Sequence, residues 1–520
     1  MVPRPAPQSP SPQLIPQWFA GREIFITGAT GFMGKVLVER LLWTCPEISR
    51  LHLLMRKKKD IPAEKRLKQL KQSQVFDVIR ENCPNQLEKL SIVAGDVTKP
   101  KLGIDRETLM KLTQVSVVFH SAATLKFDEP LGVAVEQNLR SVMTLMDICD
   151  QLPQMQVLVY VSTAYSNADL SSVEERVYPA PASLHQLLTM VDNLPEDVLA
   201  EVTPKLISPK PNTYTFTKAM AESAVSDRAN AATYAIAIFR PSIVISSLQN
   251  PFPGWIENLN GPSGVMVGVG KGMLHVLNCK GEKQADMIPV DIAIDTMIAV
   301  AWETGVDDSR SARVYNCCSY DNPTTWEQFK NHMVPAVREH PFDTVLWYPC
   351  GFYTKSELVM NVTEWLLQIA PLHAVGMIYN LFGVKLRPSL PTVCNRLRAM
   401  NDALKFFTMH EWIFSTENVK RLKERLAPAD AAVYNVDVMT INWADHCIDF
   451  VKGARKYLLK ENDKDLEKAQ NRVKVFHVVH RGLQCILALF VCRVAMMTAP
   501  AILRAIAALM NLRKKSQMFS

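Results

Sequence analysis

The 520-residue chain lacks the marks of several common protein classes. Its 11 cysteines contain no Cys-x-x-Cys pair and their number is odd, which argues against a disulfide framework and against a zinc site. We therefore expect free thiols, a reducing compartment and no bound metal. The N-terminal stretch is rich in proline and has no apolar core of a signal peptide, so residues 1–19 are predicted to be a disordered leader.

The chain also has only a small excess of positive charge, with a formal net charge of +7. Basic residues gather at 56–59, at 64–71 and near the C-terminus, without the interleaved aromatic residues of a nucleic-acid surface. We therefore expect no nucleic-acid partner and favour anionic cofactors or acidic lipid headgroups. The length exceeds one ordinary domain, so two domains with appendages are expected.

Long uncharged apolar runs are missing as well. In the apolar tail Gly482–Met510 the longest stretch without a charge is 11 residues, whereas a straight membrane span needs about 20. Arg493 and Arg504 divide this tail, so we expect membrane attachment of residues 474–520 by a tilted span, an interfacial helix or a half-inserted hairpin, with hairpin or monotopic insertion favoured. A second apolar segment, 361–384, is read as either a membrane segment or a core helix.

A glycine-rich turn near the N-terminus carries the first functional signal. A short apolar strand, Ile24–Thr27, is followed by Gly28-x-x-Gly31-x-x-Gly34 and an amphipathic helix. In a dinucleotide site these glycines permit the tight turn, the approach of backbone to the diphosphate and close helix–sheet packing. An ordinary strand–helix turn is the alternative. The residues expected to contact the cofactor here are Thr27, Gly28, Thr30, Gly31, Phe32, Met33 and Gly34.

The next strand indicates which dinucleotide is bound. Leu51–Met55 ends in Arg56-Lys57-Lys58-Lys59, where an NAD site would have Asp or Glu. A guanidinium group matches a 2′-phosphate and lysine adds charge. Arg56 and Lys57 therefore predict NADP(H), although a solvated basic loop also accounts for the last two lysines.

Apolar strand runs alternate with helical stretches up to about residue 160, which predicts an α/β fold with a Rossmann-type, doubly wound parallel sheet. The predicted strands are Ile24–Thr27, Leu51–Met55, Leu90–Ala94, Val115–His120 and Val157–Ser162. Further expected cofactor contacts follow them at Asp96, Val97, Ser121, Ala122, Ala123 and Asn138. Asn138 is also read as a side chain that bonds backbone across the sheet, or as a surface residue. Asp96 is read either as an acceptor for adenine or as the cap of the next turn.

The predicted reactive groups lie at the end of the fifth strand and on a later helix. Ser162 and Thr163 end the strand, and Tyr214 and Lys218 are four residues apart, on one helix face. An ammonium group near a phenol favours phenolate and brings its pKa towards neutrality. Lys218 can also hold the nicotinamide ribose, and a strand-end hydroxyl can polarise a carbonyl. Together with the glycine turn, this constellation resembles the extended short-chain dehydrogenase/reductase superfamily.

Longer motifs resemble the fatty acyl-CoA reductases, most closely the insect members, over residues 20–460. They are His120–Glu129, Val161–Tyr165, Lys210–Lys218, Arg240–Val244, Pro251–Pro262, Ala285–Asp291, Trp412–Phe414 and Asn435–Trp443. The resemblance implies NADPH-dependent reduction of long-chain acyl-CoA to a primary alcohol in two hydride transfers. It also favours Thr163 over Ser162 as the catalytic hydroxyl, and it implies a helical C-terminal domain.

We divide the chain into the leader, an NADP-binding reductase domain at 20–345, a mainly helical domain at 346–465 and the membrane-associated tail at 474–520. The stretch from Thr163 to Tyr214 is read as a lid or as a surface excursion. A cytosol-facing site on the endoplasmic reticulum is expected, with the peroxisome and lipid droplet as alternatives. Two other functions stay open: a steroid or sugar-nucleotide dehydrogenase or epimerase, and a catalytically idle NADPH-binding lipid tether. The oligomeric state is not indicated.

Overall fold

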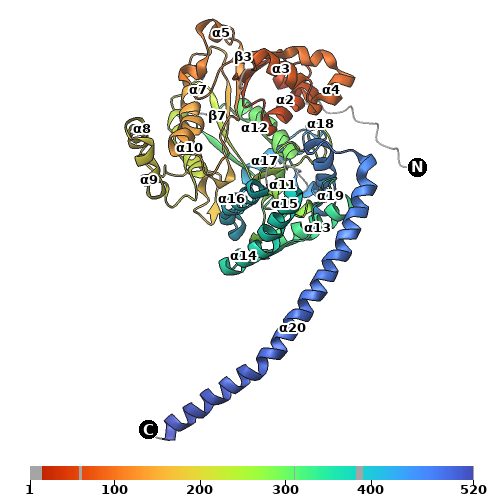
Figure 1. Cartoon of the computed structure of the whole chain (residues 1–520). Coiled ribbons are helices and arrows are strands. Elements are labelled where there is room, and N and C mark those ends of the chain that lie inside the picture. The colour runs from red at the N-terminus through yellow and green to blue at the C-terminus, as the bar shows by residue number, and fades with distance from the viewer. Residues whose placement is uncertain (1–13, 58–60, 310, 382–389, 519–520) are drawn as a thin grey trace, which may run out of the picture.

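A computed structural model of the chain describes residues 14–57, 61–309, 311–381 and 390–518 (Figure 1). Its centre is a seven-stranded parallel sheet in the order β11-β7-β5-β4-β1-β2-β3. The bounds are β1 Glu23–Thr27, β2 Arg50–Met55, β3 Leu90–Ala94, β4 Val115–His120, β5 Val157–Val161, β7 Ala235–Pro241 and β11 Arg313–Cys317. The strand order reverses between β1 and β4, which pair with each other. The predicted doubly wound sheet is confirmed, and this reversal is where such sheets bind nucleotides.

Helices cover both faces of the sheet (Figure 1). On one face α2 (Phe32–Thr44) packs against α12 (Val290–Asp307), and on the other α7 (Ser141–Cys149) packs against α10 (Thr213–Ala229). Side chains of β5 alternate between the two apolar cores: Val159 enters the first and Leu158 the second. Strand β5 is thus buried and apolar on both faces, as strands of a parallel sheet between two helical layers are.

The remaining elements are shorter or lie at the rim. The helices are α3 Ala63–Lys71, α4 Asp77–Asn82, α5 Arg106–Met110, α6 Leu131–Ala134, α8 Leu184–Asn193, α9 Glu196–Ile207, α11 Pro262–Gly270 and α18 Pro428–Ala431. Three two-stranded sheets pair β6 (Ser172–Val173) with β13 (Ile413–Phe414), β8 (Ile243–Ile245) with β10 (Met287–Pro289) and β9 (Val276–Asn278) with β12 (Phe352–Thr354).

The predicted disorder of the leader is wrong for residues 14–19. They form helix α1, Leu14–Phe19, and the side chains of Ile15 and Phe19 are fully buried. The carboxylate of Asp430 accepts hydrogen bonds from the backbone N–H groups of Leu14 and Ile15. A partner so distant in the chain leaves no local signal in the sequence. Residues 1–13 lie outside the described part of the chain.

The C-terminal half is helical, as predicted. Its helices are α13 Trp326–Glu339, α14 Glu357–Glu364, α15 Ala370–Leu381, α16 Leu390–Met409, α17 Glu417–Arg425 and α19 Trp443–Gly453. A π-helical turn, η6 (Trp365–Ile369), joins α14 to α15. The proposed division at residue 345 remains a prediction, but the two parts share a core, because buried residues from both belong to one apolar cluster.

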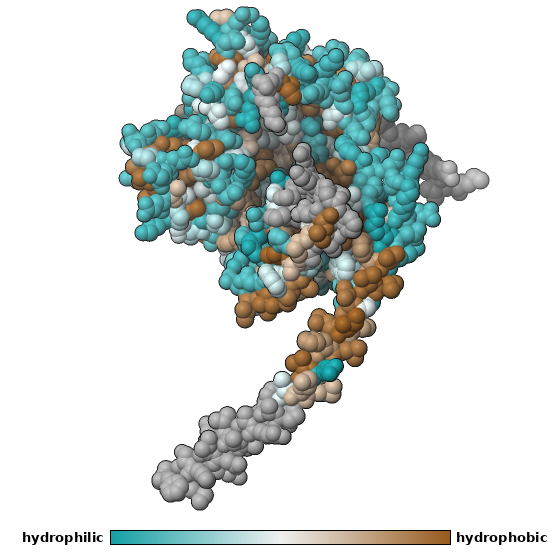
Figure 2. Space-filling view, in the orientation of Figure 1, coloured by the Kyte–Doolittle hydropathy of each residue, from teal (hydrophilic) through white to brown (hydrophobic). Residues whose placement is uncertain are grey.

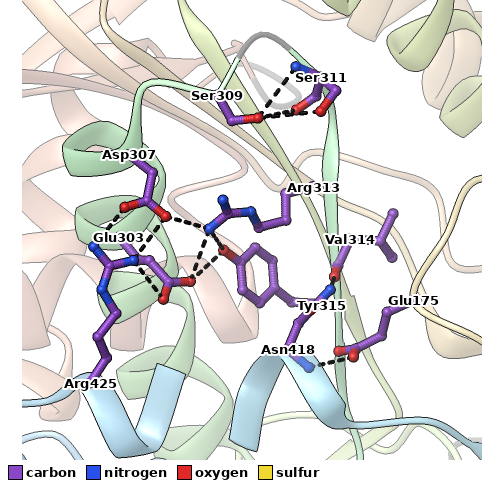
Figure 3. Close-up of polar contacts among 10 residues, drawn as sticks. All are labelled: Glu175, Glu303, Asp307, Ser309, Ser311, Arg313, Val314, Tyr315, Asn418 and Arg425. Atoms are coloured by element: carbon purple, nitrogen blue, oxygen red, sulfur yellow. Dashed lines mark hydrogen bonds and ion pairs between the residues drawn. The ribbon is translucent and has the colours of Figure 1, made fainter. Parts of the chain in front are cut away.

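Figure 3 shows how helix α17 is attached to the edge of the central sheet. Arg425 makes ion pairs with Glu303 and Asp307 of α12 at 3.1 and 2.6 Å. The side chain of Asn418 donates to the carbonyl of Val314 in strand β11 at 2.8 Å. Helix α17 is therefore held directly on strand β11 and on helix α12, which packs on the sheet.

The tail forms one helix, α20, Leu466–Met518, which projects from the body (Figures 1 and 2). Its 53 residues extend about 80 Å at 1.5 Å per residue. The favoured hairpin is wrong, because the helix has no turn at which the chain reverses. Among the described residues, Asp463–Thr498 forms the one helix long and apolar enough to cross a membrane, and an 18-residue stretch within it has a mean hydropathy of 1.7.

Candidate active site

A cavity of about 850 Å³ opens at the C-terminal edge of the sheet. It brings together residues that the sequence analysis assigned to cofactor and to chemistry. They are Gly28, Thr30, Gly31, Phe32, Met33, Gly34, Arg56, Asp96, Val97, Ser121, Ala122, Ala123, Ser162, Thr163, Tyr214 and Lys218. Thr27, Lys57 and Asn138, also predicted to contact the cofactor, are not among its lining residues.

The glycine turn has the geometry predicted for it. Gly28 has a φ of +77°, and a Cβ there would lie 2.7 Å from the backbone nitrogen of Ala122. A Cβ on Gly34 would lie 2.2 Å from the carbonyl oxygen of Gly28, so helix α2 can approach the strand only with glycine there. Gly31, the N-cap of α2, faces more open space. The cradle fits a diphosphate at the start of the helix.

Two guanidinium groups lie beside this cradle, one of which sequence analysis missed. Arg56 lines the cavity with a largely exposed side chain. Arg66, on helix α3, also lines it and donates to the carbonyl of Arg56 at 2.6 Å and to the hydroxyl of Thr30 at 3.1 Å. Burial, and secondarily the charge of Arg56, lower the pKa of Arg66. Lys57 points to solvent, and the two lysines after it lie outside the described residues.

Asp96 takes the turn-capping role that was left open. Its carboxylate accepts hydrogen bonds from the backbone nitrogen and hydroxyl of Thr98 at 3.1 and 3.0 Å. The carboxylate also lies 3.9 Å from the guanidinium of Arg56. Because Asp96 lines the cavity as well, its position is compatible with a cofactor contact.

Thr27 and Asn138 act behind the cavity wall. The hydroxyl of Thr27 is 2.8 Å from Nδ1 of His120 and accepts from the backbone nitrogen of Ala122. The amide of Asn138 accepts from the backbone nitrogen of Thr124 and donates to the hydroxyl of Thr217. These buried contacts fix the chain after β4 against its neighbours, and they use the side chains that were expected to reach the cofactor.

The strand-end hydroxyls and the tyrosine–lysine pair meet at one place. Helix α10 is capped by Asn212, whose side chain accepts from the backbone nitrogen of Thr215 at 2.9 Å. This cap sets Tyr214 in the first turn of the helix and Lys218 one turn later. The side chain of Thr163 makes a hydrogen bond with the Tyr214 side chain, and Lys218 Nζ donates to the carbonyl of Val161 at 2.7 Å.

Ser162 and Thr163 have different partners. The Ser162 hydroxyl donates to Oε1 of Glu222 at 2.5 Å, and Glu222 also receives two hydrogen bonds from the buried guanidinium of Arg240. The Ser162 proton is therefore engaged by a carboxylate, whereas the Thr163 hydroxyl faces Tyr214. This geometry favours Thr163 as the hydroxyl available to a substrate.

The expected fall in the tyrosine pKa is not found. Burial raises the pKa of Tyr214 to about 12, and the hydrogen bond with Thr163 opposes the rise only in part. Burial lowers the pKa of Lys218 to about 7, against the opposing charge of Glu222. Desolvation is thus the largest effect on the pKa of both groups. At neutral pH Tyr214 is a neutral phenol, which suits a proton donor better than a base.

Apolar residues from the C-terminal half line the rest of the cavity. Helix α13 contributes Phe329 and Met333, and helix α16 contributes Met400, Leu404 and Phe407. The ring of Phe127 lies 5.8 Å from that of Tyr214 and 5.1 Å from that of Phe407. The catalytic edge of the sheet is therefore continuous with an apolar wall that no motif had indicated.

The segment between Thr163 and Tyr214 does not cover this cavity. None of its residues from 166 to 213, all of which are described, lines the cavity. Strand β6 pairs with β13, and Arg240 donates to the carbonyls of Glu174 and Arg176. These contacts hold the segment on the surface of the body and away from the cavity, which fits a surface excursion and not a lid.

Comparisons with known proteins agree with this fold. Residues 26–297 match a nucleotide-binding family described as male sterility protein, and residues 367–461 match the Sterile family of the same description. A reductase domain of a nonribosomal peptide synthetase from Mycobacterium tuberculosis is 18% identical, with a TM-score of 0.56 over 86% of this chain and 93% of that chain. The terminal reductase domain of the myxalamid pathway gives the same TM-score at 14% identity, over 85% of this chain and 93% of that chain. Fold and site together define a nicotinamide-dependent oxidoreductase of the extended short-chain dehydrogenase/reductase class.

Curated relatives show which family within this class the chain belongs to. Fatty acyl-CoA reductase 1 of Gallus gallus is 33% identical over 92% of this chain and 93% of its own length. Fatty acyl-CoA reductase 2 of Mus musculus is 34% identical over 90% of each chain. The chain belongs to the fatty acyl-CoA reductase family. This membership does not support the alternative of a steroid or sugar-nucleotide enzyme.

Proposed function

We propose that this protein reduces a long-chain fatty acyl-CoA to the primary fatty alcohol with release of CoA, using NADPH. One observation carries the proposal: a single cavity joins Thr163, Tyr214 and Lys218 to the apolar wall formed by α13 and α16. A cavity of about 850 Å³ lies within the range of small-molecule sites. Its apolar wall suits an acyl chain, and its polar edge suits a reacting carbonyl.

The glycine turn and Arg56 with Arg66 are proposed to hold the cofactor. The cradle at Gly28 and Gly31 suits the diphosphate, and the paired guanidinium groups suit a 2′-phosphate, which favours NADPH over NADH. When bound, NADPH supplies the hydride for each of the two reductions.

The chain's own residues then handle the oxygen and the proton. Thr163 and Tyr214 are proposed to donate hydrogen bonds to the oxygen that becomes negative when the thioester carbon is reduced. When the resulting hemithioacetal collapses, the carbon–sulfur bond breaks, the carbonyl of the aldehyde forms and the hydroxyl proton passes to sulfur, so that CoA leaves as its thiol. In the second reduction Tyr214 donates its proton to the alkoxide. Lys218, when protonated, makes that transfer easier by stabilising the phenolate left behind.

We also propose that helix α20 attaches the enzyme to a membrane with the cavity on the cytosolic side. The length and hydropathy of Asp463–Thr498 support this attachment. We place the protein at the endoplasmic reticulum, with the peroxisome and lipid droplet as the alternatives that cell fractionation distinguishes.

The test is product analysis of the purified full chain with palmitoyl-CoA and NADPH. The proposal predicts hexadecanol, with two NADPH oxidised for each CoA released. Accumulation of hexadecanal at one NADPH per CoA would contradict the second reduction. Binding of NADPH without any product would identify the idle tether instead.

A further inference from the structure

Large apolar side chains are concentrated in two exposed segments. Among the described side chains, nine lie from Phe352 to Leu381 and eleven from Val475 to Met497, whereas the others are scattered, as on most soluble surfaces. The second segment belongs to helix α20. The first requires a separate explanation, because it belongs to the body of the protein.

In the first segment polar side chains face the body and apolar side chains face the solvent, the reverse of an ordinary surface helix. Helices α14, η6 and α15 form one continuous helix from Glu357 to Leu381. Its inward positions recur every fourth residue and are Met360, Glu364, Gln368 and Leu372, all buried. Its outward positions include Leu358, Val359, Val362, Trp365, Leu366 and Leu367, which are between 44% and 74% exposed. We call these six residues the apolar face.

The inward polar groups are satisfied, so the helix is not misoriented. The Gln368 side-chain oxygen accepts hydrogen bonds from the backbone nitrogens of His275 and Val276 at 2.6 and 3.0 Å. Glu364 pairs with Arg398 at 2.9 Å. Rotating the helix to bury its apolar face would break these contacts. The orientation is therefore set by the polar side, and the apolar side is left for a partner.

We propose that the apolar face docks on the surface of a lipid bilayer, as an interfacial contact separate from helix α20. The face and α20 lie on the same lower side of the molecule in Figure 2, where apolar side chains gather below the body and along the start of the tail. A bilayer that receives α20 therefore meets the apolar face as well.

Aromatic residues lie both on the apolar face and at the point where α20 leaves the body. Trp365 stands on the apolar face, 58% exposed. Where α20 leaves the body, the ring of Trp347 lies 5.8 Å from Phe476 and that of Tyr348 lies 4.8 Å from His477. Tryptophan and tyrosine favour the headgroup level of membranes.

Charge favours the same partner. Helix α20 contains no acidic residue after Glu467, while Arg472, Lys474 and Arg481 lie in its first half. Basic residues at a membrane surface attract anionic headgroups. The inner side of helix α14, opposite the apolar face, contacts strand β9, which contributes Leu277 to the cavity lining. If the proposed substrate is correct, docking places the apolar wall next to the layer in which long acyl chains dissolve.

The test reconstitutes the full chain into phosphatidylcholine–phosphatidylserine vesicles whose acyl chains carry bromine at shallow or at deep positions. The chain has nine tryptophans, so the emission of Trp365 is isolated as the difference between the wild type and Trp365→Phe. The proposal predicts that shallow bromines quench this emission more than deep ones. Unquenched Trp365 in protein that floats with the vesicles would overturn it, and so would failure to float.

Leu366→Glu and a matched control sharpen the test. Met110 on helix α5 is 59% exposed at the opposite end of the molecule (Figure 1). Leu366→Glu is predicted to abolish most of the shallow quenching, and Met110→Glu to leave it unchanged. If the wild-type Trp365 is not quenched and Leu366→Glu lowers the oligomer mass in detergent, the face binds a second copy instead and the proposal is wrong. Quenching needs no turnover, so a failure of the proposed reaction is distinguished from a failure of this inference.

Discussion

Replacing Arg66 by alanine tests the proposed recognition of NADPH most selectively. Arg66 lines the cavity and donates to the backbone of Arg56 and to Thr30, so it both offers a charge and holds the backbone that carries the second guanidinium. A hydrogen bond to a charged group contributes about 1.5–3 kcal/mol, and 1.4 kcal/mol corresponds to about tenfold in affinity. Because Arg66 is only half-buried, the lower end applies, and the KM for NADPH is expected to rise about tenfold.

NADH provides the internal comparison, since it has no 2′-phosphate. Steady-state kinetics with both cofactors should show a large rise in KM for NADPH and a small one for NADH. Lys57→Ala is the matched control, because Lys57 is exposed and does not line the cavity. Equal losses with both cofactors in Arg66→Ala would show that the residue only supports the glycine turn, and would refute the assignment.

Two further changes probe the framework around the site. Glu222→Gln leaves the guanidinium of Arg240 buried without its carboxylate, and is expected to destabilise the fold by about 3–5 kcal/mol, measured by denaturant unfolding. The charge of Glu222 raises the pKa of Lys218, which is about 7, so the same variant should lower that pKa. Activity should then be lost at a lower pH as the pH rises, and an unchanged pH profile would show that Lys218 takes no part in the proton transfer. Gly453→Ala would place a Cβ 1.8 Å from a backbone carbonyl of the facing loop and should lower stability by at least about 1–3 kcal/mol. Gly482→Ala, which meets nothing within 4 Å, should be neutral or stabilising, and similar thermal shifts in the two glycine variants would contradict this packing.

Local pattern was sufficient for the nucleotide-binding half of the molecule. The strands are apolar runs bounded by turns, and the roles of Gly28 and Gly34 follow from the absence of a Cβ, so both are readable from a few neighbouring residues. Ser162 and Thr163 were less certain, because the choice depends on Glu222, sixty residues away in the chain. Asn138 and Thr27 were placed at the correct edge, but their hydrogen bonds are made behind the cavity wall.

Features that depend on distant partners could not be predicted. The order of α1 depends on Asp430, and the pairing of Arg66 with Arg56 depends on how α3 returns to the sheet. The sequence predicted an apolar segment around Trp365 but could not predict which side faces the body. That orientation is set by distant partners, Arg398 and the backbone nitrogens of His275 and Val276. The tyrosine pKa was misjudged because burial, a tertiary property, outweighs the helical spacing of Tyr214 and Lys218.

The central claim is that the Tyr214 hydroxyl donates the proton to the substrate oxygen. The most direct measurement is the single-turnover rate of long-chain aldehyde reduction by Tyr214→Phe, with NADPH affinity measured in parallel. Phenylalanine keeps the ring that lies 5.8 Å from Phe127, so the affinity should be unchanged while the rate falls about 10²- to 10⁴-fold. A wild-type rate in the variant would contradict the account.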